Sequence, residues 1–135
     1  MPIIRLALLA LSMKNVDVVR RNSGEIMFQR ARWCSSRWCR FKGLQFRRRL
    51  REGEALILVH PDDGVVQSSI HMFFVFFPIA AIWIDSMGRV TSAQLARPWR
   101  PYYASQKPAQ YVLETSPEFL SQVEVGDEFN FVLST

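Results

Sequence analysis

The sequence predicts a small, mainly β domain, either a β-sandwich or a partly open barrel, with one or two short helices. Runs of β-branched and aromatic residues alternate with turn-forming residues, which is typical of strands. The 135 residues leave room for one domain, and the composition, 49% hydrophobic and 21% charged, is that of a globular chain. We therefore expect a protein that is stabilised by a hydrophobic core.

The first elements are expected to be a hairpin and a short helix. Strands at 16–20 and 25–29 flank Asn22-Ser23-Gly24, a sequence rich in turn formers. Ser35 is placed to cap the helix at its N-terminus. Gly43 stands where a left-handed C-terminal residue is favoured.

The apolar middle of the chain is expected to form two buried strands. Ile70 to Ile84 is an apolar run, but as a helix its fifteen residues would span ~22 Å, less than the ~30 Å core of a bilayer. Pro78 breaks the run, because proline donates no hydrogen bond to a sheet. We expect strands at 70–77 and 79–85. The remaining strands are expected at 55–59, 90–96, 110–114 and 129–133, with turns at 61–64 and 86–88 and a helical turn capped by Thr115 and Glu118.

Charge is distributed unevenly along the chain. Residues 20–51 hold eleven basic groups and one acid, whereas residues 52–135 hold four basic and ten acidic groups. The basic segment predicts a surface that binds nucleic acid or another acidic macromolecule, with an attraction that weakens in salt. The candidate anion-binding residues are Arg37, Arg40, Arg47, Arg48, Arg49 and Arg51.

An aromatic loop extends this hypothesis. Trp99, Arg100, Tyr102 and Tyr103 combine rings that stack on bases with a cation that meets phosphate. The plain alternative is that the arginines coat the surface for solubility and the rings fold over an open end of the sandwich. No recognised nucleic-acid-binding motif accompanies the charge, so both interpretations stay open.

An enzyme or ligand-binding protein is the alternative function. His71 and Glu114 are the candidate polar residues of a pocket between the sheets, although His71 is also typical of a core position, and Glu114 is a possible partner of Arg47. His60 is expected at the surface, at a strand end. The sequence contains no glycine-rich phosphate loop and no nucleophile elbow, so we expect a non-enzymatic protein without a cofactor.

The two cysteines predict neither a metal site nor a disulfide. Cys34 and Cys39, taken with the two histidines, depart from the spacings of zinc sites. If both cysteines are helical, they lie about 140° apart around the axis. We therefore expect two thiols and a cytoplasmic protein.

The N-terminal stretch is expected to lie outside the fold. Residues 1–12 are interpreted as a disordered extension upstream of a start at Met13, and residues 13–135 as the domain. The alternative is a targeting segment that exports the protein or anchors it to a membrane.

Several motifs occur together in a recognisable order. They are Gly43-Leu44-Gln45-Phe46-Arg47, the strand pair Met72 to Asp85, Gly88-Arg89-Val90, Pro108 to Glu114 and Gly126-Asp127. As a set the motifs, which cover roughly residues 14–132, make the chain resemble the family called domain of unknown function 192. The resemblance implies a compact, mainly β domain with a short helix, found in bacteria and archaea and without an established activity.

The chain departs from that family at polar positions. Ala80 stands where many relatives carry an aspartate after proline and an aliphatic residue. Gln45 replaces a frequent methionine, and Phe73-Phe74 replaces a frequent Lys-Asn pair. A mechanism that depends on that aspartate is not expected here.

Overall fold

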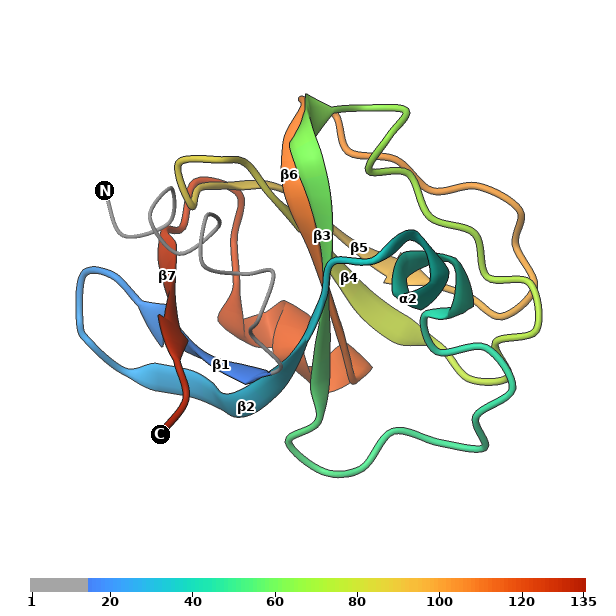
Figure 1. Cartoon of the computed structure of the whole chain (residues 1–135), viewed down its shortest axis with the longest axis horizontal. Coiled ribbons are helices and arrows are strands. Elements are labelled where there is room, and N and C mark those ends of the chain that lie inside the picture. The colour runs from blue at the N-terminus through green and yellow to red at the C-terminus, as the bar shows by residue number, and fades with distance from the viewer. Residues whose placement is uncertain (1–14) are drawn as a thin grey trace.

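The computed structural model describes residues 15–135 and confirms a mainly β fold with two short helices. The expectations for residues 1–12 and Met13 lie outside the described residues. All seven strands belong to one curled sheet (Figure 1). In chain order the elements are β1 (Asn15–Arg20), β2 (Ile26–Cys34), α2 (Arg37–Lys42), β3 (Ala55–Gly64), β4 (Ile79–Ile84), β5 (Val90–Ala96), β6 (Ala109–Thr115), the 3₁₀ helix η2 (Pro117–Gln122) and β7 (Phe129–Leu133).

The sheet is a partly open barrel. Its order is β5-β4-β6-β3-β2-β1-β7, and every pair is antiparallel except β2 with β3, between which α2 lies in the connection. The two edge strands approach each other just before they begin, where Arg89 pairs with Glu128. There the Phe129 N–H donates to the Gly88 carbonyl at 2.8 Å. The curl thus closes at one end and stays open elsewhere.

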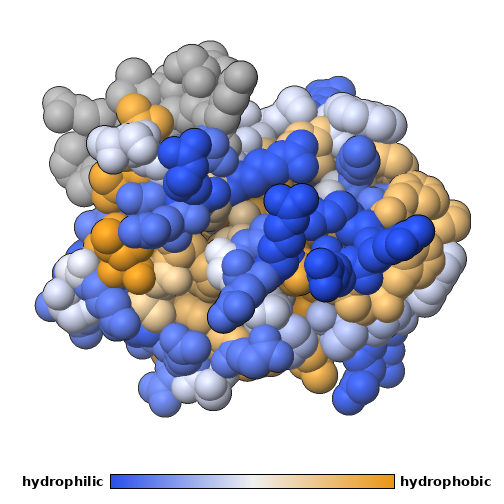
Figure 2. All heavy atoms as spheres, turned by 90° about the horizontal axis from the view of Figure 1, so that it is seen from below, coloured by the Kyte–Doolittle hydropathy of each residue, from blue (hydrophilic) through white to orange (hydrophobic). Residues whose placement is uncertain are grey.

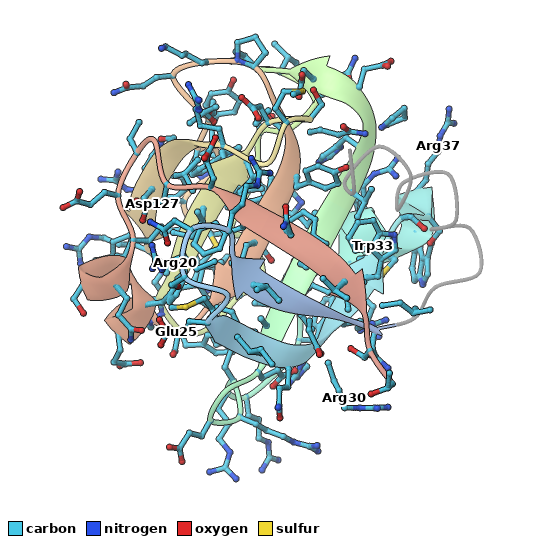
Figure 3. All side chains as sticks on the ribbon, turned by 90° about the vertical axis from the view of Figure 1, so that its left-hand side faces the viewer. Arg20, Glu25, Arg30, Trp33, Arg37 and Asp127 are labelled. Carbon is cyan, nitrogen blue, oxygen red and sulfur yellow. A yellow bond between two sulfur atoms is a disulfide. The ribbon has the colours of Figure 1, made fainter. Side chains whose placement is uncertain are left out.

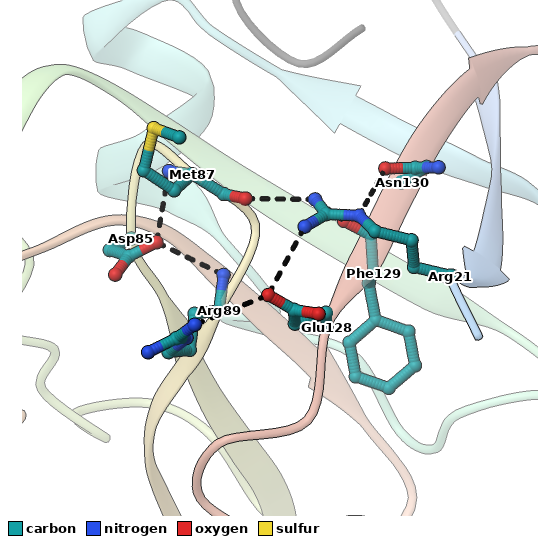
Figure 4. A network of polar contacts seen from close by, with 7 residues as sticks. All are labelled: Arg21, Asp85, Met87, Arg89, Glu128, Phe129 and Asn130. Carbon is teal, nitrogen blue, oxygen red and sulfur yellow. Dashed lines mark hydrogen bonds and ion pairs between the residues drawn. The ribbon is translucent and has the colours of Figure 1, made fainter. Parts of the chain in front are cut away.

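Side chains from three parts of the chain reinforce this closure (Figure 4). The Arg21 guanidinium donates to the Met87 carbonyl at 2.8 Å and lies 3.3 Å from the Glu128 carboxylate. Arg89 approaches the same carboxylate at 3.4 Å. Asp85 accepts from the Met87 and Arg89 N–H groups, which fixes the β4–β5 turn.

Two hydrophobic cores lie on opposite faces of the sheet. Along β3, Ile57 and Val59 belong to one core and Leu56 and Leu58 to the other, because successive side chains of a strand point to opposite faces. The first core draws on all seven strands and fills the inside of the curl. The second core lies between the central strands and the segments around α2, and it positions the candidate site.

The predicted strand 70–77 is wrong. Only Ile70 makes a bridge, to Tyr103, and the chain then forms a loop until β4. The Met72 N–H donates to the Arg100 carbonyl and the Met72 carbonyl accepts from Trp99, so the loop bonds to residues 97–103 rather than to a strand. Phe74 has a φ of 60°, which breaks an extended conformation.

Three local predictions also need correction. Ser36, not Ser35, caps α2, and its hydroxyl accepts from the Cys39 N–H at 3.1 Å. β3 continues through the predicted turn at 61–64, and the turn follows at 65–68. Thr115 does not cap η2; its hydroxyl donates to the Glu54 carbonyl at 2.8 Å, while Ser116 occupies the N-cap position.

The cysteines form a disulfide instead of two thiols. Cys34 is the last residue of β2 and Cys39 lies on α2, with their Cα atoms 5.5 Å apart. Because Cys34 ends a strand and is not helical, the angle of about 140° expected for two helical cysteines does not apply. Within residues 15–135, no helix is long and apolar enough to cross a membrane.

Candidate functional site

A cavity of about 220 Å³ opens on the side of the second core. Its walls come from β3, β4 and β6, from α2 with the residues that follow it, and from the loop 69–75. In Figure 1 β3 and β6 run through the middle of the molecule, and α2 and the loop lie to their right. Apolar side chains line its middle: Leu44, Leu58, Ile70, Met72, Val75 and Ile79.

Glu114 is the buried acid of this cavity. It pairs along the sheet with Leu56 on one side and Ala81 on the other, and it is 5% exposed. Burial raises the pKa of the Glu114 carboxyl to about 8, and no neighbour among the described residues adds a charge or hydrogen bond that offsets this rise. The carboxyl is therefore mostly protonated at neutral pH, and it can donate a hydrogen bond.

His60 lies on β3, which forms one wall of the cavity. It is four residues beyond Leu56, the residue that pairs with Glu114, so the His60 and Leu56 backbones are roughly 13 Å apart. Burial, together with the positive charge of Arg40, lowers the pKa of His60 to about 4. Its Nε2 atom is buried and has no hydrogen-bond partner among the described residues. The predicted surface position of His60 is wrong.

Arg40 supplies a positive charge at the cavity wall. One of its Nη atoms donates to the carbonyls of Ser35 and Val59, which ties α2 to β3. Burial lowers the pKa of Arg40, and the like charge of Arg37 adds to this, yet a guanidinium stays charged at neutral pH. The cavity lining thus combines two cations, Arg40 and Lys42, with the neutral acid Glu114 and the neutral imidazole of His60.

The structure places both predicted pocket residues, His71 and Glu114, in this cavity. The His71 ring lies between Phe41 and Phe73, with centroids 6.2 and 5.4 Å away, and its Nδ1 accepts from the Phe73 N–H. Gln45 also lines the cavity and donates to the Phe41 carbonyl at 2.6 Å. Glu114 does not pair with Arg47, whose guanidinium binds the Glu54 carboxylate with two bonds of 2.8 Å.

The predicted anion-binding arginines differ in their surroundings. Arg40 lines the cavity and Arg47 is held by Glu54, whereas Arg37, Arg48, Arg49 and Arg51 are exposed. Other basic residues of segment 20–51 lie elsewhere: Arg20 binds Asp127 at 2.9 Å (Figure 3). Figure 3 also shows Arg37 pointing away from that ion pair.

The aromatic loop divides in a similar way. Trp99, Arg100 and Tyr102 are exposed. Tyr103 packs against the second core, and its hydroxyl accepts from the Arg97 N–H at 2.9 Å. Part of the loop therefore serves packing, as the plain alternative predicts.

The sequence did not reveal that Arg40, His60 and Gln45 line the same cavity as Glu114. They share it because β3 continues past Val59 and because α2 folds back over the sheet. A usable signal was the alternation of Leu56, Leu58 and His60, which places all three side chains on one face of a strand.

Comparison with known proteins identifies the family. The model of the family described as Uncharacterized ACR, domain of unknown function 192, matches residues 18–131. A UPF0127 protein of Thermococcus sibiricus is 29% identical over 116 residues, which cover 84% of this chain and 73% of that protein. A UPF0127 protein of Thermococcus gammatolerans is 38% identical over 88 residues, or 65% of this chain and 56% of that protein. The match thus spans little more than half of that second relative.

Solved structures share the fold. A protein of Sinorhizobium meliloti described as a candidate transcription regulator has a TM-score of 0.74 at 20% identity, covering 87% of this chain and 92% of that one. A protein of unknown function from Novosphingobium aromaticivorans has a TM-score of 0.71 at 24% identity, covering 86% and 83%. These likenesses concern the fold alone. Since the family model matches the sequence from β1 to β7, the chain belongs to the domain of unknown function 192 family.

Proposed function

We propose that the protein binds a small organic acid in the cavity. The observation that carries this proposal is Glu114, a buried carboxyl whose pKa of about 8 leaves it neutral at pH 7. A neutral carboxyl donates a hydrogen bond to an anion, whereas an ionised one repels it. Arg40 adds the complementary positive charge. The volume of about 220 Å³, below the usual range of drug-sized pockets, favours a ligand with few heavy atoms.

Thermal unfolding with matched probes tests the proposal. Benzoate and butyrate are compared with benzamide and butyramide, which have similar shapes but no charge. Below the pKa of Glu114 the two acids should raise Tm and the amides should not, because a ligand that binds only the folded state stabilises it. Arg40→Gln should abolish the shift, whereas Arg30→Gln, at the opposite end of the molecule, should leave it unchanged.

The dependence on pH separates the role of Glu114 from that of Arg40. Above pH 8 the wild-type protein should lose the shift, because the ionised Glu114 repels the ligand. Glu114→Gln should keep it, since an amide stays neutral. Equal binding of acids and amides would contradict the proposal, as would preferential binding of butylamine, which would make Glu114 a counter-ion for a cation.

A second candidate is an acid–base enzyme that uses the same cavity. The favouring observation is that the pKa of Glu114, about 8, lies near neutrality, where general acid–base catalysis works best. Hydrolysis of p-nitrophenyl acetate provides a first assay. An enzyme should lose turnover in Glu114→Gln, whereas a binding protein keeps its ligand in that variant.

Binding of nucleic acid through segment 20–51 receives less support. Arg20, Arg21 and Arg47 are engaged by acidic partners, and they lie in different parts of the molecule. Fluorescence anisotropy with a single-stranded oligonucleotide tests this function. If segment 20–51 binds the oligonucleotide, the affinity should fall steeply between about 50 and 200 mM salt, and Arg49→Glu should abolish binding.

The disulfide bears on the cellular compartment in which the protein works. The small number of cysteines favours the cytoplasm, but a Cys34–Cys39 disulfide persists in an oxidising compartment. We propose that the protein works in such a compartment. Alkylation of the protein in its source cells before lysis should leave both cysteines unmodified, and modification of both would contradict the proposal.

A further inference from the structure

Four exposed aromatic side chains form one cluster, which we call the aromatic cluster. Phe46 is 65% exposed, Phe74 43%, Phe76 50% and Trp99 48%. The Phe46 and Phe74 rings stack with centroids 4.9 Å apart, and Trp99 lies 5.0 Å from Phe74 and 5.9 Å from Phe76. Large apolar groups that stay together in water usually mark an interaction site.

The backbone holds this cluster in place. Phe46, Phe74 and Trp99 all have positive φ values, of 64°, 60° and 68°, a conformation that is disfavoured for residues with a Cβ atom. The Phe46 N–H donates to the Phe74 carbonyl at 2.9 Å, and the Trp99 N–H donates to the Met72 carbonyl at 2.8 Å. The three rings are therefore fixed at the surface by bonds between three loops, rather than exposed by loose ends.

Basic residues flank the cluster and outnumber the acidic residues of the segments that form it. Residues 37–54, 65–78 and 97–108 contain ten Lys and Arg and two acids, Glu52 and Glu54, of which Glu54 binds Arg47; the rest of the chain contains seven basic and ten acidic residues. Arg47 and Arg48 directly follow Phe46, and Arg100 follows Trp99. Figure 2 shows strongly hydrophilic side chains beside a hydrophobic area at the right-hand end of the molecule.

We propose that this end of the molecule docks on a membrane surface rich in anionic phospholipid. An apolar centre that enters the headgroup region and a cationic rim that meets the phosphates are the two requirements of interfacial binding. In single-strand nucleic-acid sites, by contrast, separate rings alternate with charges along a groove. Here the rings pack on one another, and none of the four lines the cavity, so the arrangement fits a lipid surface better.

Sedimentation with vesicles tests the proposal. The protein should pellet with vesicles that contain about one third phosphatidylglycerol in phosphatidylcholine, and it should stay in solution with phosphatidylcholine alone. Arg49→Glu should weaken binding to the anionic vesicles about tenfold or more, because each charge near the surface contributes to the attraction. The matched control is Arg30→Glu, an exposed arginine on the far face shown in Figure 3, which should bind like the wild type.

A second measurement isolates the rings from the charges. Trp99→Ser should weaken binding to anionic vesicles at a salt concentration where Arg49→Glu no longer differs from the wild type, because salt screens charges but not apolar contact. Brominated lipids should quench tryptophan fluorescence in the wild type, and less in Trp99→Phe, which keeps an aromatic ring. Because Trp99→Phe is a mild substitution and the variant should still bind, a smaller quenching shows that Trp99 itself contacts the lipid.

Three outcomes would overturn the proposal. The first is equal binding to neutral and anionic vesicles, and the second is an equal effect of Arg49→Glu and Arg30→Glu. The third is binding of a single-stranded oligonucleotide, but not of vesicles, that depends on Arg49 and Trp99, which would assign the surface to nucleic acid. None of these results depends on whether the cavity binds an organic acid.

Discussion

Glu114 and His60 face one cavity, and burial displaces their pKa values in opposite directions. In each case burial opposes the charged form, so the pKa of the acid rises and that of the base falls. Both residues are therefore mostly neutral in the folded protein near pH 7. The folded chain keeps two neutral groups in the cavity that water would hold partly or fully ionised.

The stability of the protein should depend on pH through these two residues. Unfolding moves the pKa of Glu114 from about 8 to 4.5, so Glu114 lowers stability as pH rises between those values. Unfolding moves the pKa of His60 from about 4 to 6.5, so His60 lowers stability as pH falls from 6.5 to about 4. The two effects oppose each other between 4.5 and 6.5, where we expect a plateau. Above the plateau, stability should fall by roughly 1 kcal/mol per pH unit.

Urea denaturation across this pH range measures the effect, with the variants as controls. Glu114→Gln should remove the alkaline fall and turn the plateau into a fall of stability as pH drops from 6.5 to about 4, because the effect of His60 is then unopposed. His60→Asn should remove the plateau and let stability fall as pH rises from 4.5 to about 8. An alkaline fall of equal size in Glu114→Gln would assign the loss of stability to other groups.

The sequence suggested Glu114 and His71 as pocket residues, and both line the cavity, whereas His60 was expected at the surface and is buried. Pro61 suggested that the strand ends at Val59, since proline is rare within sheets. In the structure β3 continues to Gly64, and the His60 side chain stays on the face of Leu56 and Leu58. The point at which β3 ends, which Pro61 obscures in the sequence, decides whether this histidine is buried.

At the scale of elements, α2 positions one side of the cavity although it has only six residues. A helix of this length is not stable alone. Ser36 caps it, the Gly43 N–H donates to the Cys39 carbonyl at its end, and the disulfide joins it to β2. Tertiary contacts therefore hold Arg40 and Gly43 at the cavity.

Loss of the disulfide should weaken both the fold and the binding site. Cys34→Ala/Cys39→Ala should lower the free energy of unfolding by about 2 kcal/mol, the value for closing a short loop. Because Arg40 lies on α2, the affinity for the organic acid should fall as well. Urea denaturation and titration with benzoate measure the two effects.

Reductant provides the control for this prediction. It should lower the stability of the wild type to that of the double variant and leave the variant unchanged. Equal stability of the oxidised wild type and the double variant would show that the disulfide does not hold α2.

The loop 70–78 shows why the composition of an element can mislead. Its β-branched and aromatic residues favour a strand, yet Met72 and Val75 are buried while Phe73, Phe74 and Phe76 are exposed, which is not an alternating pattern. The hydrogen bonds of Met72 with residues 97–103 decide its conformation. Those contacts span more than twenty residues of sequence, so local propensity could not reveal them.

At the scale of the whole molecule, one sheet separates two cores that share the strands β3, β4 and β6. Neither core is complete without these strands. If either core unfolds, the apolar face of these strands that it covered is exposed to water. The two cores should therefore unfold together.

Two single-tryptophan variants test this cooperativity. One keeps only Trp33, in the first core, and the other keeps only Trp83, in the second core. In each variant the midpoint of unfolding in urea should be the same by fluorescence and by circular dichroism, as two-state unfolding requires. A separate transition for Trp83 at lower urea would show that the second core unfolds independently.

Charge is uneven along the sequence, but the sequence does not reveal how that charge is distributed over the surface. Segment 20–51 contains both Arg20, which binds Asp127, and Arg49, which is exposed on a loop near the aromatic cluster. The turn between β1 and β2 and the return through α2 send these residues to different parts of the molecule. Net charge along a chain is read directly from its residues, whereas a charged face depends on topology.

An NMR titration of the Glu114 side-chain carboxyl carbon, assigned by comparison with Glu114→Gln, tests whether Glu114 is neutral at pH 7. The midpoint should lie near pH 8 in the free protein and move higher when benzoate is bound, because the anion disfavours ionisation. A midpoint near the ordinary value of 4.5 would contradict the proposed function, since an ionised Glu114 would repel the ligand class that we propose.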